Sequence, residues 1–516
     1  MPDYMFYLKM RYKSVFSALA KVMFMQSILI LIVGALAFVF SQGNHFFPFF
    51  YTSLLSFLIT VIFKVLSRGN KTESMNVQDA MLTVFFIWTI SILVSAMPFY
   101  FGKILGLTQS IFESASGWST TGLTVIADVE SIPKVYLLWR SIIQYIGGAG
   151  FALIMIVVAG NSGAGLYQAE GRTDNLVPNI RDSAKLILVI YLIWAVAGIT
   201  ALMIFGKLSF FDAFNHALTA LATGGFSTKN SSIGYFNNVT AELIIMILMI
   251  SGATGFGVHY SLVQLIKNYF KSRKDLTNGK INRLDFKERM KAEPFLKNPE
   301  PKTMFYTLVI SIILLVVLCT VHIYSLPQAV RHSVFTAISA LTGTGFQTVT
   351  FEKWNTLGLF VITILMIFGG MTDSTSGGLK TFRVYVIIKV MILQVKNYFR
   401  PQGTEHHIEV YKGVGKKKID LGVFKEVIAV VFMYIIVFVT GSLILVGHGF
   451  SLEDSMFEFS SALSAVGLTV GITAPDAPSS ILWTLIGGMY LGRFEFFLIF
   501  YAVIRLIKDL MLKLKN

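Results

Sequence analysis

Ten long apolar runs divide the chain, and no other feature constrains its fold as strongly. Each run is close to the 20 residues or so that an α-helix needs to cross the hydrocarbon core of a bilayer. Only 14% of the 516 residues are charged, whereas about a quarter are charged in a typical soluble protein. We therefore predict an all-α polytopic membrane protein. The runs lie near residues 22–41, 46–66, 79–101, 135–159, 184–205, 239–266, 304–324, 355–395, 425–447 and 480–505.

The segments between the runs alternate in their content of basic residues. Six segments, which include both ends of the chain, carry 33 Lys and Arg residues, and four segments assigned to the opposite side carry 6. This is the positive-inside pattern, so both termini and the basic loops 276–302 and 401–423 are predicted to be cytoplasmic. Topology alone accounts for the net charge of +15 without nucleic-acid binding. Docking of a cytoplasmic partner or of anionic lipid headgroups to these loops stays open.

The four segments poor in basic residues repeat one pattern, in which a Phe stands ten residues before a Gly without a gap. The pairs are Phe112 and Gly122, Phe214 and Gly224, Phe335 and Gly345, and Phe457 and Gly467. Each segment lies between two apolar runs, so a unit of span, re-entrant loop and span occurs four times. The predicted domains are two extra spans at 1–70 and repeats at 71–165, 180–275, 303–400 (with a broken inner helix) and 424–516.

The repeated segment has physical properties that suit a cation pathway. Ten helical residues rise about 15 Å, which is half the hydrocarbon thickness. The inward C-terminal end of such a helix carries partial negative charge. The chain that returns outward survives at this depth only if it lines a watery cavity or is buried in protein. Four such stretches around one axis would present rings of carbonyl oxygens that hold dehydrated potassium. Small-residue helix packing is the alternative for a single Thr-Gly pair.

Five motifs complete the pattern, at residues 119–124, 139–148, 223–228, 373–380 and 492–495. With them the chain resembles the Trk/Ktr/HKT superfamily of cation-translocating proteins. The two extra N-terminal spans make it most similar to the TrkH type, and the resemblance covers nearly the whole chain. It implies a fourfold pseudosymmetric pore, a homodimer, and a cytoplasmic regulatory subunit of the RCK nucleotide-binding type.

The resemblance also assigns a potassium filter. Glycine at all four filter positions resembles the potassium-preferring members, because Ser replaces the first glycine in sodium-preferring plant relatives. The Phe spacing favours Gly224 over Gly225 in the second repeat, and Ala465 and Val466 depart from the Thr or Gly of other repeats. The predicted filter residues are Thr120, Thr121, Gly122, Thr223, Gly224, Gly225, Thr344, Gly345, Val466 and Gly467.

A glycine-rich stretch interrupts the long run at 355–395. Each glycine destabilises a helix by about 1 kcal/mol relative to Ala, so the backbone should leave helical geometry here. A kink that serves packing is one interpretation, and the resemblance implies instead an intramembrane loop that plugs the pore below the filter. The predicted gate residues in this stretch are Gly369, Gly370, Thr372, Asp373, Ser374, Thr375, Ser376, Gly377 and Gly378.

Two arginines lie within apolar runs. Arg493 is about twelve residues into the last run, and a charge at such depth is expensive and functional by default. We predict that Arg493 projects into the pore beside the 369–378 stretch, as an electrostatic barrier that binds carbonyls or Asp373. A structural ion pair with Glu495 or with another buried acid is the alternative. Arg140 is shallower and is predicted to brace a pore helix, with Gln144 one turn on along the same face.

The predicted function is potassium uptake across the cell membrane, with K+ as the transported ion and no organic cofactor. A K+/H+ or K+/Na+ symporter is the alternative, and so is a less selective monovalent cation channel. Symport needs a titratable group or a second ion site in the path. An enzyme is the least favoured interpretation, because the sequence shows neither convergent catalytic groups nor a phosphate-binding loop in its strand and helix context.

Overall fold

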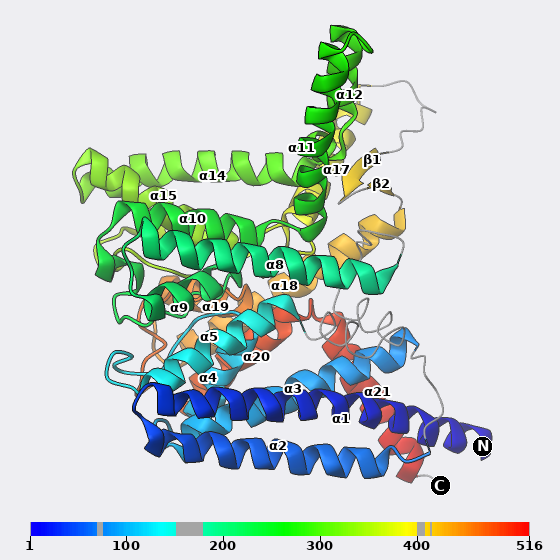
Figure 1. Ribbon diagram of the computed structural model, residues 1–516, viewed down its shortest axis with the longest axis vertical. Coiled ribbons are helices and arrows are strands. Elements are labelled where there is room, and N and C mark those ends of the chain that lie inside the picture. The colour runs from blue at the N-terminus through cyan, green and yellow to red at the C-terminus, as the bar shows by residue number, and fades with distance from the viewer. Residues whose placement is uncertain are drawn as a thin grey trace.

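The computed structural model describes residues 2–69, 76–150, 179–399, 408–412, 415–419 and 421–514. The chain begins with two long helices, α1 (Pro2–Val39) and α2 (Phe46–Leu66), which the short helix η1 (Gly43–His45) joins. They lie side by side at the bottom of Figure 1. Their approach is close at Gly34, where an added Cβ would lie 2.5 Å from the Cβ of Phe49. These helices are the two extra spans that the sequence predicts.

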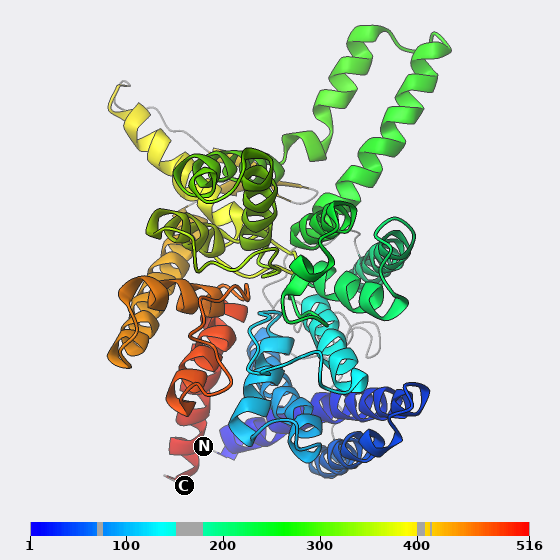
Figure 2. The ribbon, with the colours of Figure 1, turned by 90° about the vertical axis from the view of Figure 1, so that its left-hand side faces the viewer.

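The helices that follow form four groups, and each group holds a long helix, a short helix and an inner helix. Figure 2 looks from the side of the short helices and shows the groups as four coloured sectors around one centre. The groups are α3 (Val77–Phe101), α4 (Leu107–Trp118) and α5 (Lys134–Ala149); α8 (Ile180–Ile204), α9 (Phe210–Leu221), α10 (Val239–Ala253) and α11 (Phe256–Thr277); α14 (Pro299–Leu318), α15 (Leu326–Thr342), α16 (Thr356–Phe368) and α17 (Thr381–Asn397); and α18 (Leu421–Gly447), α19 (Leu452–Leu463), α20 (Ser479–Arg493) and α21 (Phe497–Leu514).

Most of the short helices are too short to span a bilayer. Three of them, α4, α9 and α19, have 12 residues each, which corresponds to a rise of about 18 Å. Ser209 caps α9 by accepting a hydrogen bond from the amide of Asp212, and Ser451 caps α19 in the same way. The cap oxygen satisfies an amide that would otherwise lack a partner at the start of the helix.

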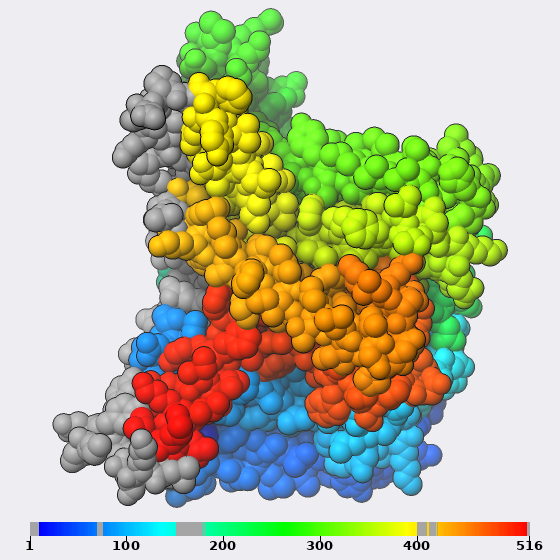
Figure 3. Space-filling model, turned by 180° about the vertical axis from the view of Figure 1, so that it is seen from behind, coloured from blue at the N-terminus to red at the C-terminus, as the bar shows by residue number. Residues whose placement is uncertain are grey.

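The long helices confirm a multi-pass membrane protein. Within the described residues, six helices are long and apolar enough to cross a membrane, and a seventh crossing results if the bent pair α10 and α11 is counted as one span. Their outer faces are apolar, as on α18 (orange in Figure 3), where Phe432 is 62% exposed and Leu443 is 58% exposed. Such faces suit contact with lipid.

The inner helices break at several points where the sequence predicts a break only at 369–378. The helices α10 and α11 meet at an angle of 106°. Residues 494–496 separate α20 from α21, and Glu495 and Phe496 have φ angles of 52° and 69°. In the first group α5 ends at Ala149, and the predicted continuation of this span to 159, like the end of repeat one at 165, lies outside the described residues.

Two features lie in the half of the molecule away from the short helices (Figure 1). The helix α11 continues through α12 (Arg283–Ala292) and α13 (Pro294–Lys297) as a hairpin that stands out from the body (Figure 1). The strands β1 (Ile408–Lys412) and β2 (Gly415–Ile419) form an antiparallel pair in the predicted loop 401–423, where the sequence pattern predicts no strand. Both chain ends lie on this same side. Short helices at η3 (Ser232–Phe236) and η4 (Thr320–His322) complete the described elements.

Candidate functional site

Each short helix ends in a strip of three residues with the same backbone path. The first residue of the strip has a left-handed conformation, with φ of 60° at Thr120, 52° at Thr223, 72° at Gly343 and 54° at Ala465. The third residue is a glycine, also left-handed, with φ of 93°, 71°, 81° and 98° at Gly122, Gly225, Gly345 and Gly467. We call these segments strips one to four: 120–122, 223–225, 343–345 and 465–467.

The four strips touch one another in a closed order. A Cβ added to the third residue of a strip would overlap the carbonyl oxygen of the second residue in the next strip. The carbonyls met in this way belong to Gly224, Thr344, Val466 and Thr121, for glycines 122, 225, 345 and 467 in turn. The order runs from strip one to strip four and back to strip one. We call the four carbonyl oxygens of Thr121, Gly224, Thr344 and Val466 the carbonyl ring.

This geometry corrects the register of the second repeat. Gly225, and not Gly224, has the conformation and the contact that Gly122, Gly345 and Gly467 share. The Phe spacing is therefore misleading, because Asn215 and not Phe214 stands ten residues before the equivalent glycine. Gly224 instead supplies a carbonyl oxygen to the ring.

A buried hydroxyl six residues before each of these glycines marks the register better than the Phe does. Ser116 Oγ accepts from the amide of Gly122 at 3.0 Å, and Ser461 Oγ accepts from that of Gly467 at 2.9 Å. Thr219 and Ser339 donate to the carbonyls of Phe226 and Phe346, at 2.9 Å and 2.8 Å. The sequence contains this signal, and the Phe pattern does not use it.

The buried carboxylates of Glu113 and Glu458 hold the chain that leaves the strips. Glu113 accepts from the hydroxyl of Thr124 at 3.0 Å, and Glu458 accepts from that of Thr469 at 2.8 Å. In the second repeat His216 takes the corresponding place, with its Nε2 2.9 Å from Ser227 Oγ. Glu113, Glu458 and His216 are fully buried, and their hydrogen bonds stabilise the outgoing backbone.

Arg140 and Gln144 lie on one face of α5 and brace the strips of two repeats. Arg140 Nε donates to Glu113 at 2.7 Å, and its Nη1 donates to the carbonyl of Ser227 at 3.1 Å. Gln144 Nε2 donates to the carbonyl of Gly224 at 2.6 Å, and Gln144 Oε1 accepts from the amide of Phe226 at 3.1 Å. Both side chains are buried, in agreement with the bracing role that the sequence suggested for Arg140.

The stretch 369–378 is an irregular loop between α16 and α17 that packs against the inner ends of the strips. Thr375 Oγ1 lies 3.0 Å from Thr223 Oγ1 and donates to the carbonyls of Leu221 and Gly252, at 3.1 Å and 2.9 Å. A Cβ added to Gly377 would overlap the carbonyl oxygen of Ser464, which directly precedes strip four. The other residues of the loop extend these contacts: Gly369 and Gly378 pack against each other, Gly370 N donates to Ser376 Oγ, Thr372 N donates to Glu300, Phe256 N donates to the Asp373 carbonyl, and Ser374 Oγ donates to Met371 O.

Arg493 links this loop to the first repeat. Its Nη1 donates to the Thr375 carbonyl at 3.0 Å and to Thr120 Oγ1 at 3.2 Å, and its Nη2 donates to the carbonyl of Gly147. Together, Arg493 and Thr375 connect residues from all four repeats in one chain of hydrogen bonds. The predicted approach of Arg493 to this loop is thus present in the structure. Glu495, the alternative partner of Arg493, forms an ion pair with Arg383.

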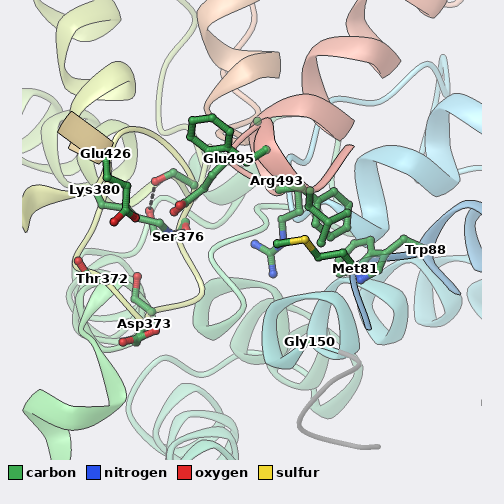
Figure 4. A pocket seen from close by; sticks show the side chains of 16 residues that line it. Met81, Trp88, Gly150, Thr372, Asp373, Ser376, Lys380, Glu426, Arg493 and Glu495 are labelled. Atoms are coloured by element: carbon green, nitrogen blue, oxygen red, sulfur yellow. Dashed lines mark hydrogen bonds between the residues drawn. The ribbon is translucent and has the colours of Figure 1, made fainter. Parts of the chain in front are cut away.

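A cavity of about 220 Å³ is lined by residues of the loop and by Arg493. Figure 4 shows Lys380, Glu426 and Glu495 on one side and Arg493 with Met81 and Trp88 on the other. Lys380 Nζ donates to the carbonyl of Ser376 in the loop. The cavity therefore carries charges of both signs, and residues of the loop form part of its wall.

Comparisons with known proteins identify a family that matches most of the chain. The model of the TrkH family, described as a cation transport protein, covers residues 45–509. The chain is 29% identical over 474 residues to an uncharacterized cation transporter of Methanocaldococcus jannaschii, with 88% of this chain and 91% of that protein covered. It is also 29% identical over 440 residues to the Trk system potassium uptake protein TrkG of Escherichia coli K12, with 82% and 84% covered.

A solved structure matches the fold. The crystal structure of the potassium transporter TrkH from Vibrio parahaemolyticus superposes with a TM-score of 0.78 and covers 95% of this chain and 98% of that chain. The sequences of the two are 24% identical, so this likeness establishes the fold.

Proposed function

This chain belongs to the TrkH family of cation transport proteins, and on that premise we propose that it takes up potassium through the carbonyl ring. The observation that carries the proposal is the closed order in which the four strips touch. Carbonyl oxygens replace the hydration shell of a potassium ion when several converge on one point. Relatives named potassium uptake proteins support K+ as the ion. The membrane potential would drive entry with about 2.3 kcal/mol per charge per 100 mV.

The filter in this proposal consists of the strip residues that the sequence pattern assigns, with Gly225 in place of Gly224 as the second glycine. The C-terminal ends of the four short helices lead directly into the strips, and their partial negative charge favours a cation there. Since the ring oxygens belong to the backbone, Val466 serves as well as Thr121 or Thr344. The side-chain departures in strip four then leave the ring complete.

The gate in this proposal is the loop 369–378 together with Arg493. The loop lies against the inner ends of strips two and four, and Arg493 touches strip one. A fixed positive charge on the ion path opposes a passing cation strongly, because the effective dielectric constant there is below that of water. Opening requires that the bonds between Arg493, Thr375 and Thr120 separate.

We propose further that both termini are cytoplasmic, that the protein works as a homodimer, and that an RCK-type nucleotide-binding subunit regulates it. The excess of basic residues on the side of the chain ends supports this orientation. The hairpin of α11 and α12 lies in the half of the molecule toward that side and offers a surface to a regulator. Relatives named as parts of a Trk system support the existence of further components.

Flux measurements in liposomes that contain only this chain test the proposed function. We expect K+ and Rb+ to enter faster than Na+ and Li+. A reversal potential that follows K+ alone supports a channel, whereas one that shifts with pH or Na+ favours the symporter. The proposal would be contradicted if neither the wild type nor the Arg493→Ala variant, both correctly folded, carried K+.

A further inference from the structure

Strip two differs from the other strips at its middle residue. Gly224 stands where the others have Thr121, Thr344 and Val466. The backbone does not require glycine there, because Gly224 is outside the left-handed region that Gly225 occupies. Space does require it, since an added Cβ would lie 2.5 Å from Cδ, 2.6 Å from Oε1 and 2.8 Å from Nε2 of Gln144. The glycine therefore makes room for one particular side chain of α5.

Gln144 also differs from its counterparts in two other inner helices. Gly147, Gly252 and Gly492 each face the carbonyl at the last residue of a short helix, namely Trp118, Leu221 and Leu463, which an added Cβ would overlap. These glycines mark equivalent positions in α5, α10 and α20. The residues one turn before them, three positions back, are Gln144, Met249 and Met489, and all three are buried. Met cannot donate a hydrogen bond, whereas the Gln amide donates and accepts.

The amide of Gln144 engages strip two on both sides of Gly225. It donates to the carbonyl of Gly224, a member of the carbonyl ring, and accepts from the amide of Phe226. We propose that Gln144 is a positioning residue for ion selectivity, an inference that rests on the proposed function. We call the two hydrogen bonds of the Gln144 amide the clamp. The clamp fixes the position of the Gly224 oxygen and engages one of its lone pairs. This limits how far the ring contracts around an alkali cation smaller than K+.

A thermal stability cycle tests the contact itself and needs no transport activity. The full chain in detergent is melted as wild type, Gly224→Ala, Gln144→Ala and the double variant. Gly224→Ala is expected to lower the melting temperature because its Cβ meets the Gln144 amide. In the Gln144→Ala background the same substitution should cost about half of that loss or less, since the effects of substitutions at residues in contact are not additive. Additive losses would overturn the proposed clamp.

Flux ratios in liposomes test the role in selectivity. Gln144→Met is expected to lower the K+/Na+ flux ratio by about threefold or more, as the loss of one hydrogen bond to the ring allows. Gln144→Glu keeps the acceptor for Phe226 but loses the donor to Gly224, so its ratio should fall as well. Met489→Leu, at the equivalent buried position of α20, is the matched control and should keep the wild-type ratio.

The double variant Gln144→Met/Gly224→Thr places Met and Thr at the positions equivalent to those of Met249 and Thr344 in the following repeats. It should conduct better than Gly224→Thr alone and still show the lowered ratio. An unchanged ratio in Gln144→Met, or a folded double variant that conducts no better than Gly224→Thr, would overturn the inference. If the wild type itself carries no K+, the proposed function is wrong, and the melting cycle still tests the contact between Gln144 and Gly224.

Discussion

At the scale of single residues, the third position of each strip combines two demands. The backbone is left-handed there, and a side chain would overlap the carbonyl of the next strip. Glycine satisfies both at little cost, whereas other residues are strained in that conformation and meet the oxygen. Each of the four glycines is therefore a direct probe of the ring.

Replacement of Gly122 by Ser should weaken the preference for K+ over Na+. The Ser side chain would displace the Gly224 oxygen and distort the ring. The measurement is the K+/Na+ flux ratio in liposomes. Gly487→Ala on α20 is a suitable control, because an added Cβ there meets no atom within 4 Å. Intact selectivity in Gly122→Ser would argue against a filter at this position.

The buried ion pair of Arg140 and Glu113 should be expensive to break. Arg140→Met leaves the Glu113 carboxylate buried without its cation, so we expect a loss of about 3–5 kcal/mol in unfolding free energy. Adding Glu113→Gln should recover part of it. The exposed pair of Lys185 and Asp182 is the control, since such a pair contributes about 1 kcal/mol at most. Equal melting temperatures for Arg140→Met and Lys185→Met would contradict this account.

The site was only partly predictable from residue patterns. Glycines 122, 345 and 467 followed from the spacing, because the repeats share one backbone path. The prediction for the second repeat was wrong because Phe214 stands one position out of register. Gly224, next to the equivalent Gly225, is a glycine because it packs against Gln144, which is 80 positions away in the chain. A pattern within one repeat contains no information about a contact that another repeat makes.

At the scale of elements, the loop 369–378 and the break before α21 meet at Arg493. The helix α20 ends at Arg493, and the two left-handed residues that follow redirect the chain into α21. The Glu495 side chain then reaches Arg383 on α17. The end of α20 is thereby tied to the helix that continues the loop.

Loss of Arg493 or of part of the loop 369–378 should open the ion pathway. Arg493→Ala removes the charge and the bonds to Thr375 and Thr120, so K+ flux in liposomes should rise. Shortening the loop by removal of 371–376 should have the same effect. The variants must elute from size exclusion as the wild type does. Flux that is unchanged or lower in such folded variants would count against the gate.

The breaks in the inner helices were predictable only where composition signals them. The glycine-rich composition of 369–378 predicts a loop there, because glycine weakens helices. The break at 494–496 has neither Gly nor Pro, and in the structure it accompanies contacts of Arg493 and Glu495 with distant repeats. Tertiary contacts of this kind override local propensity, and a single sequence does not display them.

At the scale of the whole molecule, the orientation can be tested by labelling. The sequence has one cysteine, Cys319, which is buried. In a Cys319→Ser background, a single introduced cysteine is then the one site at which labelling is measured. Glu130→Cys, in the loop after strip one, should react with an impermeant reagent from outside the cell. Leu284→Cys on α12, where Leu284 is 72% exposed, should react only after the membrane is opened. The reverse pattern would overturn the cytoplasmic assignment of both termini.

The overall architecture was the most predictable level. Apolar runs and basic segments set the helices and their alternation, since the bilayer imposes length and polarity directly. The hairpin of α11 and α12 and the strands β1 and β2 were not predicted, because polar segments outside the bilayer lack that constraint. The repetition of one unit predicted four similar groups of helices, and their arrangement around one centre was implied by the family resemblance and not by the repeat itself.

The central claim is that four backbone carbonyls, from Thr121, Gly224, Thr344 and Val466, together hold a dehydrated potassium ion. The most direct measurement is an anomalous difference map from crystals of the full chain in which Tl+ or Rb+ replaces K+. The account predicts a peak on the common axis, at coordination distance from all four oxygens. A ring without a peak while the ion appears elsewhere along the chain, or oxygens that point away from a shared axis, would contradict it.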